Sequence, residues 1–330
     1  MMTEISKIDR ESLSRAKSII DAGGVVAFPT ETVYGLGADA RNTDAINKIF
    51  EIKGRPTDNP LIVHVHRDYD IGELVKEVPE YAEKLAKAYL PGPLTMVYRS
   101  RGVVSPAVSC GLDTLAVRIP SHKGAQEFLK FVGVPIAAPS ANISKHVSPT
   151  SADHVYNDLN GKIELILDGG SCSGGIESTV LDCTGDIPVI LRSGLITREM
   201  IERVAGACGE YTYREGGVAR SPGMKYKHYS PACRTAFFEN ADEALALYNN
   251  ERKKGVKAVI LCDKSTFMTI GVAVEAIILG DTPEEMAANL YSKLREAEGK
   301  AEILIAIAPE RRDGVMVGVM NRLMKACSKG

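Results

Sequence analysis

The prediction of the fold starts from residues 25–37, which read VVAFPTETVYGLG. The first four residues are an apolar run that a proline ends, as expected of a short buried strand. A helix is predicted just before it, over residues 9–22, because apolar residues recur there at helical spacing and Gly23-Gly24 ends it. The polar stretch 29–37 then follows the carboxyl end of the strand, where α/β sheets place their ligands.

The same alternation of helical and strand patterns continues along the chain. Further helices are predicted from Thr43 and over 79–90, 123–132, 151–159 and 197–206, and strands over 61–65, 94–98, 115–119, 134–138, 163–167, 178–183 and 187–191. This alternation predicts an α/β sheet whose faces are covered by helices. Three strand patterns crowd between residues 163 and 191, so the sheet is predicted to contain antiparallel parts and to be mixed.

The periodicity fades over residues 209–234, where Gly, Pro, Tyr, Lys, Arg and His are frequent. Because so long a stretch without regular structure is uncommon in a compact domain, we predict a linker that acts as a lid over a site. The alternation then resumes, with helices over 241–254, 284–298 and 315–327 and strands over 256–262, 272–279 and 303–307. The predicted domains are residues 1–208 and 235–330, the second being a smaller doubly wound unit.

The composition is that of an ordinary globular protein. The 330 residues are 45% hydrophobic and 25% charged, which excludes a disordered chain, a collagen and a coiled coil. A net charge of -2 disfavours a dedicated nucleic-acid-binding protein, which would carry a basic excess. The seven cysteines are widely spaced, so we expect reduced thiols in a cytoplasmic protein. No apolar run approaches the roughly 20 residues of a membrane span, and the polar N-terminus is not a secretory signal.

Several familiar catalytic motifs are missing from the sequence. It contains no G-x-x-x-x-G-K-[ST] phosphate loop, no G-x-S-x-G nucleophile turn and no H-E-x-x-H metal site. Short polar stretches instead adjoin the predicted strands and helices, at residues 29–37, 53–56 followed by Asn59, 139–144, 174–179 and 191–194. His64 and His66 could share a strand face and hold a metal, although alternating polar residues on a half-buried strand are the simpler interpretation.

Two features indicate an anionic ligand. Lys53-Gly54-Arg55-Pro56 ends a helix, where cations either complement the helix dipole or clamp an oxyanion, and both interpretations stay open. Arg118 lies in an otherwise apolar strand and needs a partner, which an anionic ligand would provide. Nothing in these stretches pairs a nucleophile with its base. Together they indicate that anions are held and aligned, as in phosphoryl and nucleotidyl transfer.

In these motifs the sequence resembles the YrdC family, in its long two-domain form. The residues that carry the resemblance are 29–36, 53–56, 59–61, 139–142, 177–180 and 191–194, together with SPGMKYKHY at 221–229. The resemblance covers essentially the whole chain. It implies a YrdC-like twisted, open mixed sheet with a concave basic pocket, followed by a smaller Rossmann-like C-terminal domain.

The resemblance also implies an enzyme. It would make L-threonylcarbamoyladenylate and pyrophosphate from L-threonine, bicarbonate and ATP, with Mg²⁺. This is the first step of the threonylcarbamoyladenosine modification of tRNA next to the anticodon, and a downstream threonylcarbamoyl-transferase complex would use the product. No metal ligand from the protein is identified, and any contact with tRNA is expected to be weak.

The resemblance also implies site residues, at the positions of this sequence that match those of the family. The catalytic charges would be Lys53 and Arg55. L-Threonine would contact Thr32, His64, Arg118, Ala138 and Ser178. ATP would contact Arg55, Asn59, Thr114, Ser140, Asn142, Ser148, Arg192 and, in the linker, Tyr226.

Three alternatives stay open at this point. An RNA-binding module without catalysis would fit a concave basic surface, although the net charge, the absence of Trp and the 6% aromatic content disfavour it. An enzyme that forms a carbamoyl-adenylate from carbamoyl phosphate would be a much longer chain, with zinc-finger and acylphosphatase-like segments. An α/β protein whose polar stretches are only turns is disfavoured by the number of matching motifs.

Overall fold

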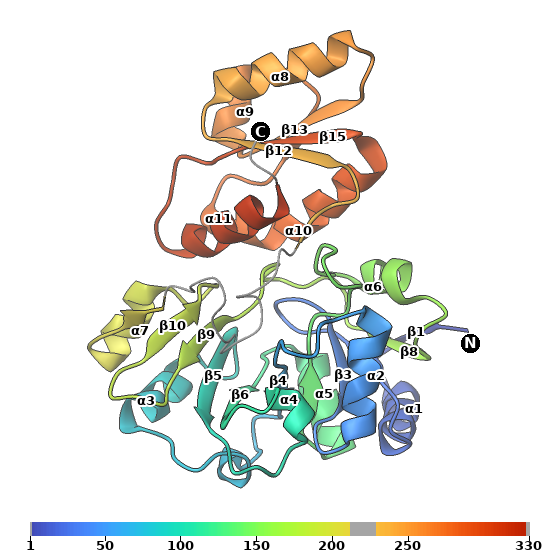
Figure 1. Cartoon of the computed structure of the whole chain (residues 1–330), viewed down its shortest axis with the longest axis vertical. Coiled ribbons are helices and arrows are strands. Elements are labelled where there is room, and N and C mark those ends of the chain that lie inside the picture. Colours follow the sequence, from blue (N-terminus) through green and yellow to red (C-terminus); the bar gives the residue numbers. More distant parts are fainter. Residues whose placement is uncertain (1, 212–228, 328–330) are drawn as a thin grey trace. The chain divides into compact units, whose positions relative to one another are not determined.

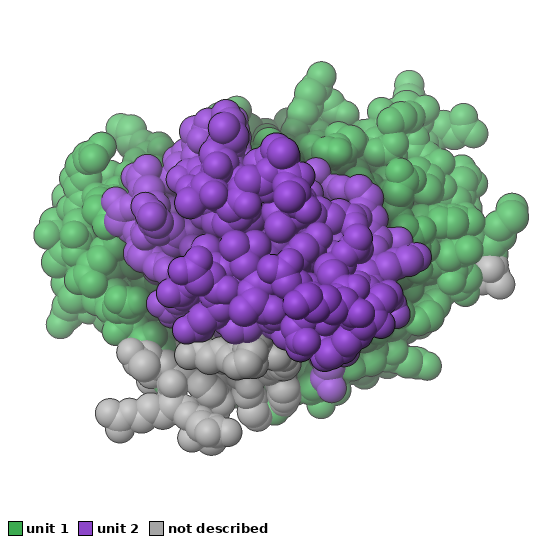
Figure 2. Space-filling view, turned by 90° about the horizontal axis from the view of Figure 1, so that it is seen from above, with its two compact units in different colours: residues 1–144, 148–226 green, residues 145–147, 227–330 purple. Residues whose placement is uncertain are grey.

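The computed structural model describes residues 2–211 and 229–327, so Tyr226 and most of the predicted lid at 209–234 lie outside the described residues. The chain divides into two compact units (Figure 2), one of residues 1–144 and 148–226 and the other of residues 145–147 and 227–330. Each unit has a sheet of its own. The predicted fold class, a mixed α/β sheet with a second, smaller α/β unit, is confirmed.

The first unit is built on an eleven-stranded mixed sheet (Figure 1). In chain order its strands are β1 (Glu4–Lys7), β2 (Val26–Phe28), β3 (Gly35–Asp39), β4 (Ile62–His64), β5 (Leu94–Arg99), β6 (Thr114–Arg118), β7 (Ile136–Ala138), β8 (Leu165–Asp168), β9 (Thr179–Asp182), β10 (Val189–Arg192) and β11 (Gly209–Glu210). Across the sheet they lie in the order β1-β8-β2-β3-β7-β4-β6-β5-β9-β10-β11. The helices are α1 (Arg10–Asp21), α2 (Thr43–Lys53), α3 (Glu80–Tyr89), α4 (Pro106–Ser109), α5 (Lys123–Val132), α6 (Ala152–Leu159) and α7 (Arg198–Ala205), with a short 3₁₀ turn at Ile71–Glu73.

Helices cover one face of this sheet fully and the other only in part. Alternate strand residues, Val63 and Val117 among them, form the main core with α2, α3, α4, α6 and α7. On the opposite face α1 and α5 pack on β2, β7 and β8. Beside them β4, β5, β6, β9 and β10 carry a small apolar cluster to which no described helix residue belongs. Ile62 of that cluster pairs in register with Ala138 of the α1–α5 core, so the two lie on one face.

The sheet differs from the prediction around residues 35–39. No strand is predicted within the polar stretch 29–37, but its last three residues belong to β3, which pairs antiparallel with β2 and β7. Glycine hides this strand in the sequence, because it has little strand preference. The packing nevertheless requires glycine at position 37, because a Cβ there would lie 2.6 Å from Ile136 Cγ2. The short strands β1 and β11 were also not predicted.

The crowded strand patterns between residues 163 and 191 separate in space. β9 and β10 pair antiparallel, as the prediction of a mixed sheet requires. β8 instead lies between β1 and β2, parallel to both. Local spacing identifies these strands but not their neighbours, because pairing across the sheet is set by the packing of the whole domain.

The turn after β10 is fixed against the start of β9. A Cβ on Gly194 would lie 2.5 Å from the backbone nitrogen of Thr179 and 2.7 Å from the carbonyl oxygen of Glu177, so only glycine fits. The Thr179 hydroxyl donates to the Ile196 carbonyl at 2.7 Å and accepts from the Ile196 N–H at 3.1 Å. The motifs at 177–180 and 191–194 are therefore held side by side by backbone contact.

The second unit has a parallel four-stranded sheet in the order β12-β15-β13-β14. Its elements are β12 (Arg234–Phe238), α8 (Ala241–Lys253), β13 (Ala258–Cys262), α9 (Lys264–Ile270), β14 (Ala276–Ile278), α10 (Pro283–Lys300), β15 (Ile303–Ile307) and α11 (Val315–Ala326). A capping box of Thr282 and Glu285 starts α10. β12 and α9 were not predicted; α9 has no buried residue, so its sequence carries no amphipathic signal.

Neither unit contains a described helix that is both long and apolar enough to cross a membrane. All seven cysteines are free thiols. Burial raises the pKa of Cys172 to about 12, so this thiol, which adjoins the site described next, stays protonated at neutral pH.

Candidate active site

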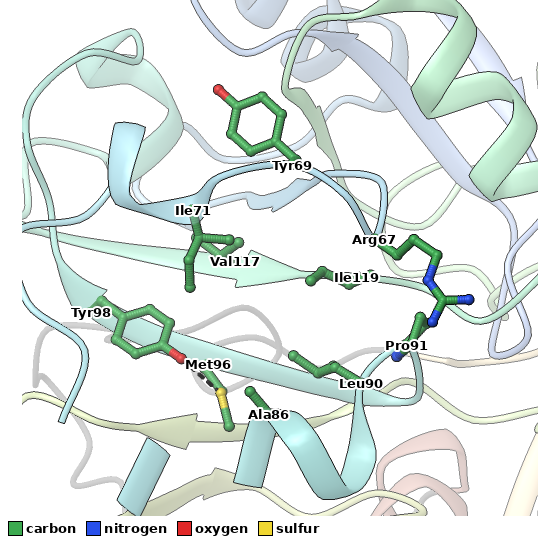
Figure 3. A pocket seen from close by; sticks show the side chains of 10 residues that line it. All are labelled: Arg67, Tyr69, Ile71, Ala86, Leu90, Pro91, Met96, Tyr98, Val117 and Ile119. Atoms are coloured by element: carbon green, nitrogen blue, oxygen red, sulfur yellow. Dashed lines mark hydrogen bonds between the residues drawn. The ribbon is translucent and has the colours of Figure 1, made fainter. Parts of the chain in front are cut away.

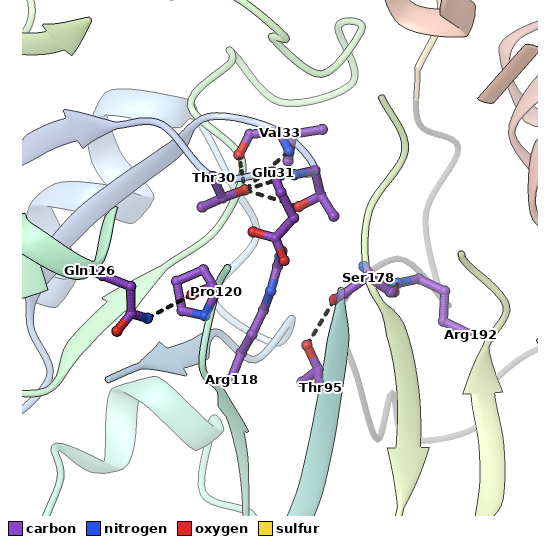
Figure 4. A network of polar contacts seen from close by, with 10 residues as sticks. Thr30, Glu31, Val33, Thr95, Arg118, Pro120, Gln126, Ser178 and Arg192 are labelled. Carbon is purple, nitrogen blue, oxygen red and sulfur yellow. Dashed lines mark hydrogen bonds and ion pairs between the residues drawn. The ribbon is translucent and has the colours of Figure 1, made fainter. Parts of the chain in front are cut away.

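Polar side chains gather on the face of the sheet that the helices leave partly uncovered (Figure 4). The strand register places His64 beside Arg118 on one side and Thr95 beside Arg118 on the other, and residues paired in this way share a face. The Thr95 and Ser178 hydroxyls lie 2.7 Å apart. Arg192 donates to the Ser178 carbonyl at 3.1 Å and to its hydroxyl at 3.2 Å. The structure thus brings four predicted site residues together, namely His64, Arg118, Ser178 and Arg192. Thr95, which was not predicted, lies with them.

The partner of Arg118 is Glu31, which sequence reasoning missed. Arg118 Nη2 lies 2.8 Å from Glu31 Oε1, and the side chains are only 4% and 10% exposed. The contact is close but poorly aligned. Among the described residues, neither Glu31 oxygen has a hydrogen-bond partner, and neither do Arg118 Nε and Nη2. The prediction left the partner of Arg118 to an anionic ligand; a buried acid directly after an apolar strand was the available signal that the chain carries its own.

A local turn sets the position of Glu31. The Thr30 hydroxyl accepts from the backbone N–H groups of Thr32 and Val33, both at 3.2 Å, and donates to the Val33 carbonyl at 2.6 Å. The Thr32 hydroxyl lies 3.0 Å from that of Thr30. The Gly174 N–H donates to the Glu31 carbonyl at 2.7 Å, which ties the turn to the 174–179 stretch. Thr30 therefore caps the turn that carries Glu31.

His64 is a buried, neutral group in this cluster. Its Nδ1 lies 3.1 Å from the Ile62 carbonyl oxygen, and its ring meets Phe28 edge to face at 5.8 Å. Burial, and then the charge of Arg118, lower its pKa to about 3. His66 lies beyond the end of β4 and packs edge to face on Tyr69, 5.9 Å away. Within residues 2–211 and 229–327, no three His, Cys, Asp or Glu side chains are grouped so as to hold a metal.

A second group of predicted residues forms around Lys53. Its ammonium, at the end of α2, donates to the Ser140 carbonyl at 2.6 Å and, more closely still, to that of Asn142. The Ser140 hydroxyl donates to Asn142 Oδ1 at 2.5 Å. Burial, and then the charge of Arg55, hold the pKa of Lys53 well below its usual range. Lys53 thus holds the 140–142 loop in place. This role differs from both interpretations of the sequence, in which the lysine complements the helix dipole or clamps an oxyanion.

Arg55 and Asn59 are joined through the backbone. The Arg55 guanidinium donates to the carbonyls of Asn59 and Pro60 at 3.1 Å. The Asn59 side chain is 1% exposed, and neither its Nδ2 nor its Oδ1 has a hydrogen-bond partner among the described residues. A buried amide without partners costs free energy, so this group marks a place where a ligand could supply them.

The predicted residues fall at two ends of the same strands. Thr114 begins β6 and Arg118 ends it on the same face, four residues or about 13 Å apart. Ile62 pairs with both Ala116 and Ala138, so Asn59, Thr114 and Ser140 gather near the end at which β4 and β6 begin. The predicted L-threonine contacts His64, Arg118 and Ser178 lie toward the other end. Ala138, Arg192 and Ser148 are exceptions. Ala138 pairs with Ile62 at the end where β4 begins, whereas Arg192 pairs with Val180 and Ser148 contacts Glu177, both next to the Ser178 end.

Ser148 is connected to the site by a hydrogen bond to Glu177. Its hydroxyl donates to Glu177 Oε1 at 2.7 Å, and Glu177 directly precedes Ser178. Ser148 is only 1% exposed, so this hydrogen bond is shielded from water. The contacts described here do not link Thr114 to the other side chains, although they share a strand face.

A cavity of about 240 Å³ lies behind the same strands (Figure 3). It is lined by Arg67, Tyr69, Ile71, Ala86, Leu90, Pro91, Met96, Tyr98, Val117 and Ile119. Val117 and Ile119 flank Arg118 in the sequence, so they point away from the polar cluster. The lining is mostly apolar, and the Tyr98 hydroxyl donates to the Met96 sulfur at 2.8 Å. This cavity lacks the converging charges and hydroxyls that mark the opposite face.

The depressed pKa of His64 predicts a pH dependence of stability. The unfolded chain protonates His64 near pH 6.5, whereas the folded chain does so only near pH 3, so stability falls as the pH drops below 6.5. Between pH 6.5 and 5 this loss should be about 2 kcal/mol in the free energy of unfolding. Urea denaturation at both pH values should show that the His64→Gln variant lacks this part of the loss. An equal loss in the variant would mean that the pKa of His64 is the same in the folded and the unfolded protein.

Comparisons with known proteins point to one family. Residues 18–194 match the Sua5, YciO and YrdC family, described as "Telomere recombination", and residues 196–328 match "Threonylcarbamoyl-AMP synthase, C-terminal domain". The chain is 42% identical to the threonylcarbamoyl-AMP synthase of Pyrococcus abyssi over 97% of this chain and 95% of that one, and 43% identical to that of Bacillus subtilis over 98% and 94%. The crystal structure of P. abyssi Sua5 complexed with L-threonine matches with a TM-score of 0.89, at 41% identity over 98% of this chain and 96% of that chain. As the motifs indicate, the chain belongs to the Sua5/YrdC family of threonylcarbamoyl-AMP synthases, in its two-domain form.

Proposed function

We propose that the chain synthesises L-threonylcarbamoyladenylate and pyrophosphate from L-threonine, bicarbonate and ATP. The threonine amine and bicarbonate combine to a carbamate with loss of water. The carbamate carboxylate attacks the α-phosphorus of ATP, and the bond from that phosphorus to pyrophosphate breaks. The names of the relatives and the L-threonine complex of P. abyssi Sua5 support this assignment. We further propose that a threonylcarbamoyl-transferase complex consumes the product in tRNA modification.

The observation that carries the proposal is the buried Arg118, whose Nε and Nη2 make no hydrogen bond to any described residue. A guanidinium binds a carboxylate through a planar fork of N–H groups, and the attraction is stronger in a dry site than in water. We assign the threonine carboxylate to Arg118. We assign Thr32, His64 and Ser178 to the same ligand, together with the backbone of Ala138.

ATP is assigned to the other end of the strands. Asn59, Ser140 and Thr114 lie there, with the Lys53 ammonium fixed beside Ser140. Two anions must meet in the adenylation step, so positive charge and positioning are what the enzyme supplies. A polyphosphate near Lys53 and Arg55 would favour the charged form of the lysine, which burial otherwise disfavours. Mg²⁺ enters with ATP as its complex and neutralises part of the phosphate charge.

The function is tested by pyrophosphate release from ATP and Mg²⁺, with L-threonine and bicarbonate omitted one at a time. Release that requires both substrates is the expected result, because the carbamate is the attacking group. Release that is indifferent to threonine, or none at all, would contradict the proposed reaction. A salt-titrated tRNA binding assay on the same preparation would then test the RNA-binding alternative.

Asn59 offers a test of the ATP assignment that is separate from folding. The Asn59→Ala variant removes a buried amide that has no described partner, so the free energy of unfolding should change by less than about 1 kcal/mol. The KM for ATP should rise about tenfold, because the ligand loses its contacts with the amide.

The Asn42→Ala variant is the matched control. Asn42 caps α2, and its side chain accepts from the Ala45 N–H at 3.1 Å. This variant should lose about 1 kcal/mol of stability while keeping the KM for ATP. If Asn59→Ala instead lowers stability and leaves the KM unchanged, Asn59 is a structural residue.

A further inference from the structure

The Glu31–Arg118 pair has the charge pattern of a receptor for a zwitterion. Arg118 offers Nε and Nη2 as unmet donors, and Glu31 offers both carboxylate oxygens as unmet acceptors, among the described residues. Both residues are more than nine-tenths buried, at 4% and 8% exposure. Groups so desolvated are costly unless hydrogen bonds satisfy them. An α-amino acid carries a carboxylate and an ammonium one carbon apart, which are the two groups that this pair lacks.

We propose that Glu31 binds the α-amino group of the substrate, while Arg118 binds its carboxylate, so that the site selects a free α-amino acid. The inference rests on the proposed function and adds a substrate-binding residue to it. Nothing in the motif assignments gives Glu31 a role. The α-amino group, which becomes the carbamate nitrogen, would then be held in a fixed position at the Arg118 end of β6. Thr114, a predicted ATP contact, lies at the other end of this strand.

The geometry of the turn supports this role over a purely structural one. The Thr30 hydroxyl and the Gly174 N–H hold the backbone of residues 31–33, so the place of Glu31 in the turn beside the site does not depend on its contact with Arg118. A residue that served only as a counter-ion would be expected to form aligned hydrogen bonds with the guanidinium. Glu31 instead approaches Arg118 at 2.8 Å with both oxygens still unpaired. In Figure 4 its carboxylate points toward Arg118.

The test compares two ligands in two proteins. L-Threonine and (R)-3-hydroxybutanoate differ only in the α-amino group, and their affinities are measured by calorimetry for the full chain and for Glu31→Gln. The wild type should prefer threonine. Glu31→Gln should lower that preference about tenfold or more, because it removes the charged acceptor for the amine and leaves the carboxylate contact. Glu31→Asp, which keeps the charge, should retain part of the preference.

Glu251→Gln is the matched control. Glu251 is a buried glutamate of the second unit, paired with Arg234 and Lys254 at 2.8 and 2.6 Å, and its variant should bind both ligands as the wild type does. If Glu31→Gln weakens both ligands equally, Glu31 only holds Arg118 and the inference is wrong. If the wild type binds threonine no better than hydroxybutanoate, there is no amine recognition to assign. Pyrophosphate release by the wild type tests the proposed function separately. If release requires threonine, the proposed reaction holds even when the binding data reject the role of Glu31.

Discussion

The site depends on one ion pair that is buried with its hydrogen bonds unmet. Glu31 and Arg118 come from a turn after β2 and from the end of β6, and they meet on the face of the sheet that helices cover only in part. Desolvating two charges costs several kcal/mol, and a poorly aligned contact does not repay that cost. The rest of the first unit must supply this free energy, which it does through the large apolar core on the opposite face.

The strands therefore perform two tasks with alternate residues. Val63, Leu115 and Val117 bury their side chains in the main core, while His64, Thr114 and Arg118 face the site. Because β4 and β6 are parallel and in register, His64 and Arg118 lie side by side at one end of this face, and Thr114 lies at the other end. Lys53 joins the end of α2 to the 140–142 loop, so a helix, a loop and the sheet set the position of one end of the site.

The sequence predicts most elements and the family, because helical and strand periodicities are strong and the polar stretches have specific spacings. It also predicts that Arg118 needs a partner. It does not identify Glu31 as that partner, because the two residues are 87 positions apart and only the strand order β2-β3-β7-β4-β6 brings them together. The contacts of Lys53 with two carbonyls escape prediction for the same reason. Strand β3 is hidden because its glycines are selected for close packing against Ile136 and Phe28, not for strand preference.

The central claim is that the Glu31–Arg118 pair is kept for ligand binding at a cost to stability. Urea unfolding of Glu31→Leu, Arg118→Met and the double variant tests it most directly. Each single variant leaves an unpaired buried charge and should lose about 3 kcal/mol or more, whereas the double variant should lie within about 1 kcal/mol of the wild type or above it, with threonine binding abolished. A double variant at least as unstable as either single variant would contradict the claim, because replacing the pair as a whole would then cost the fold as much stability as breaking it.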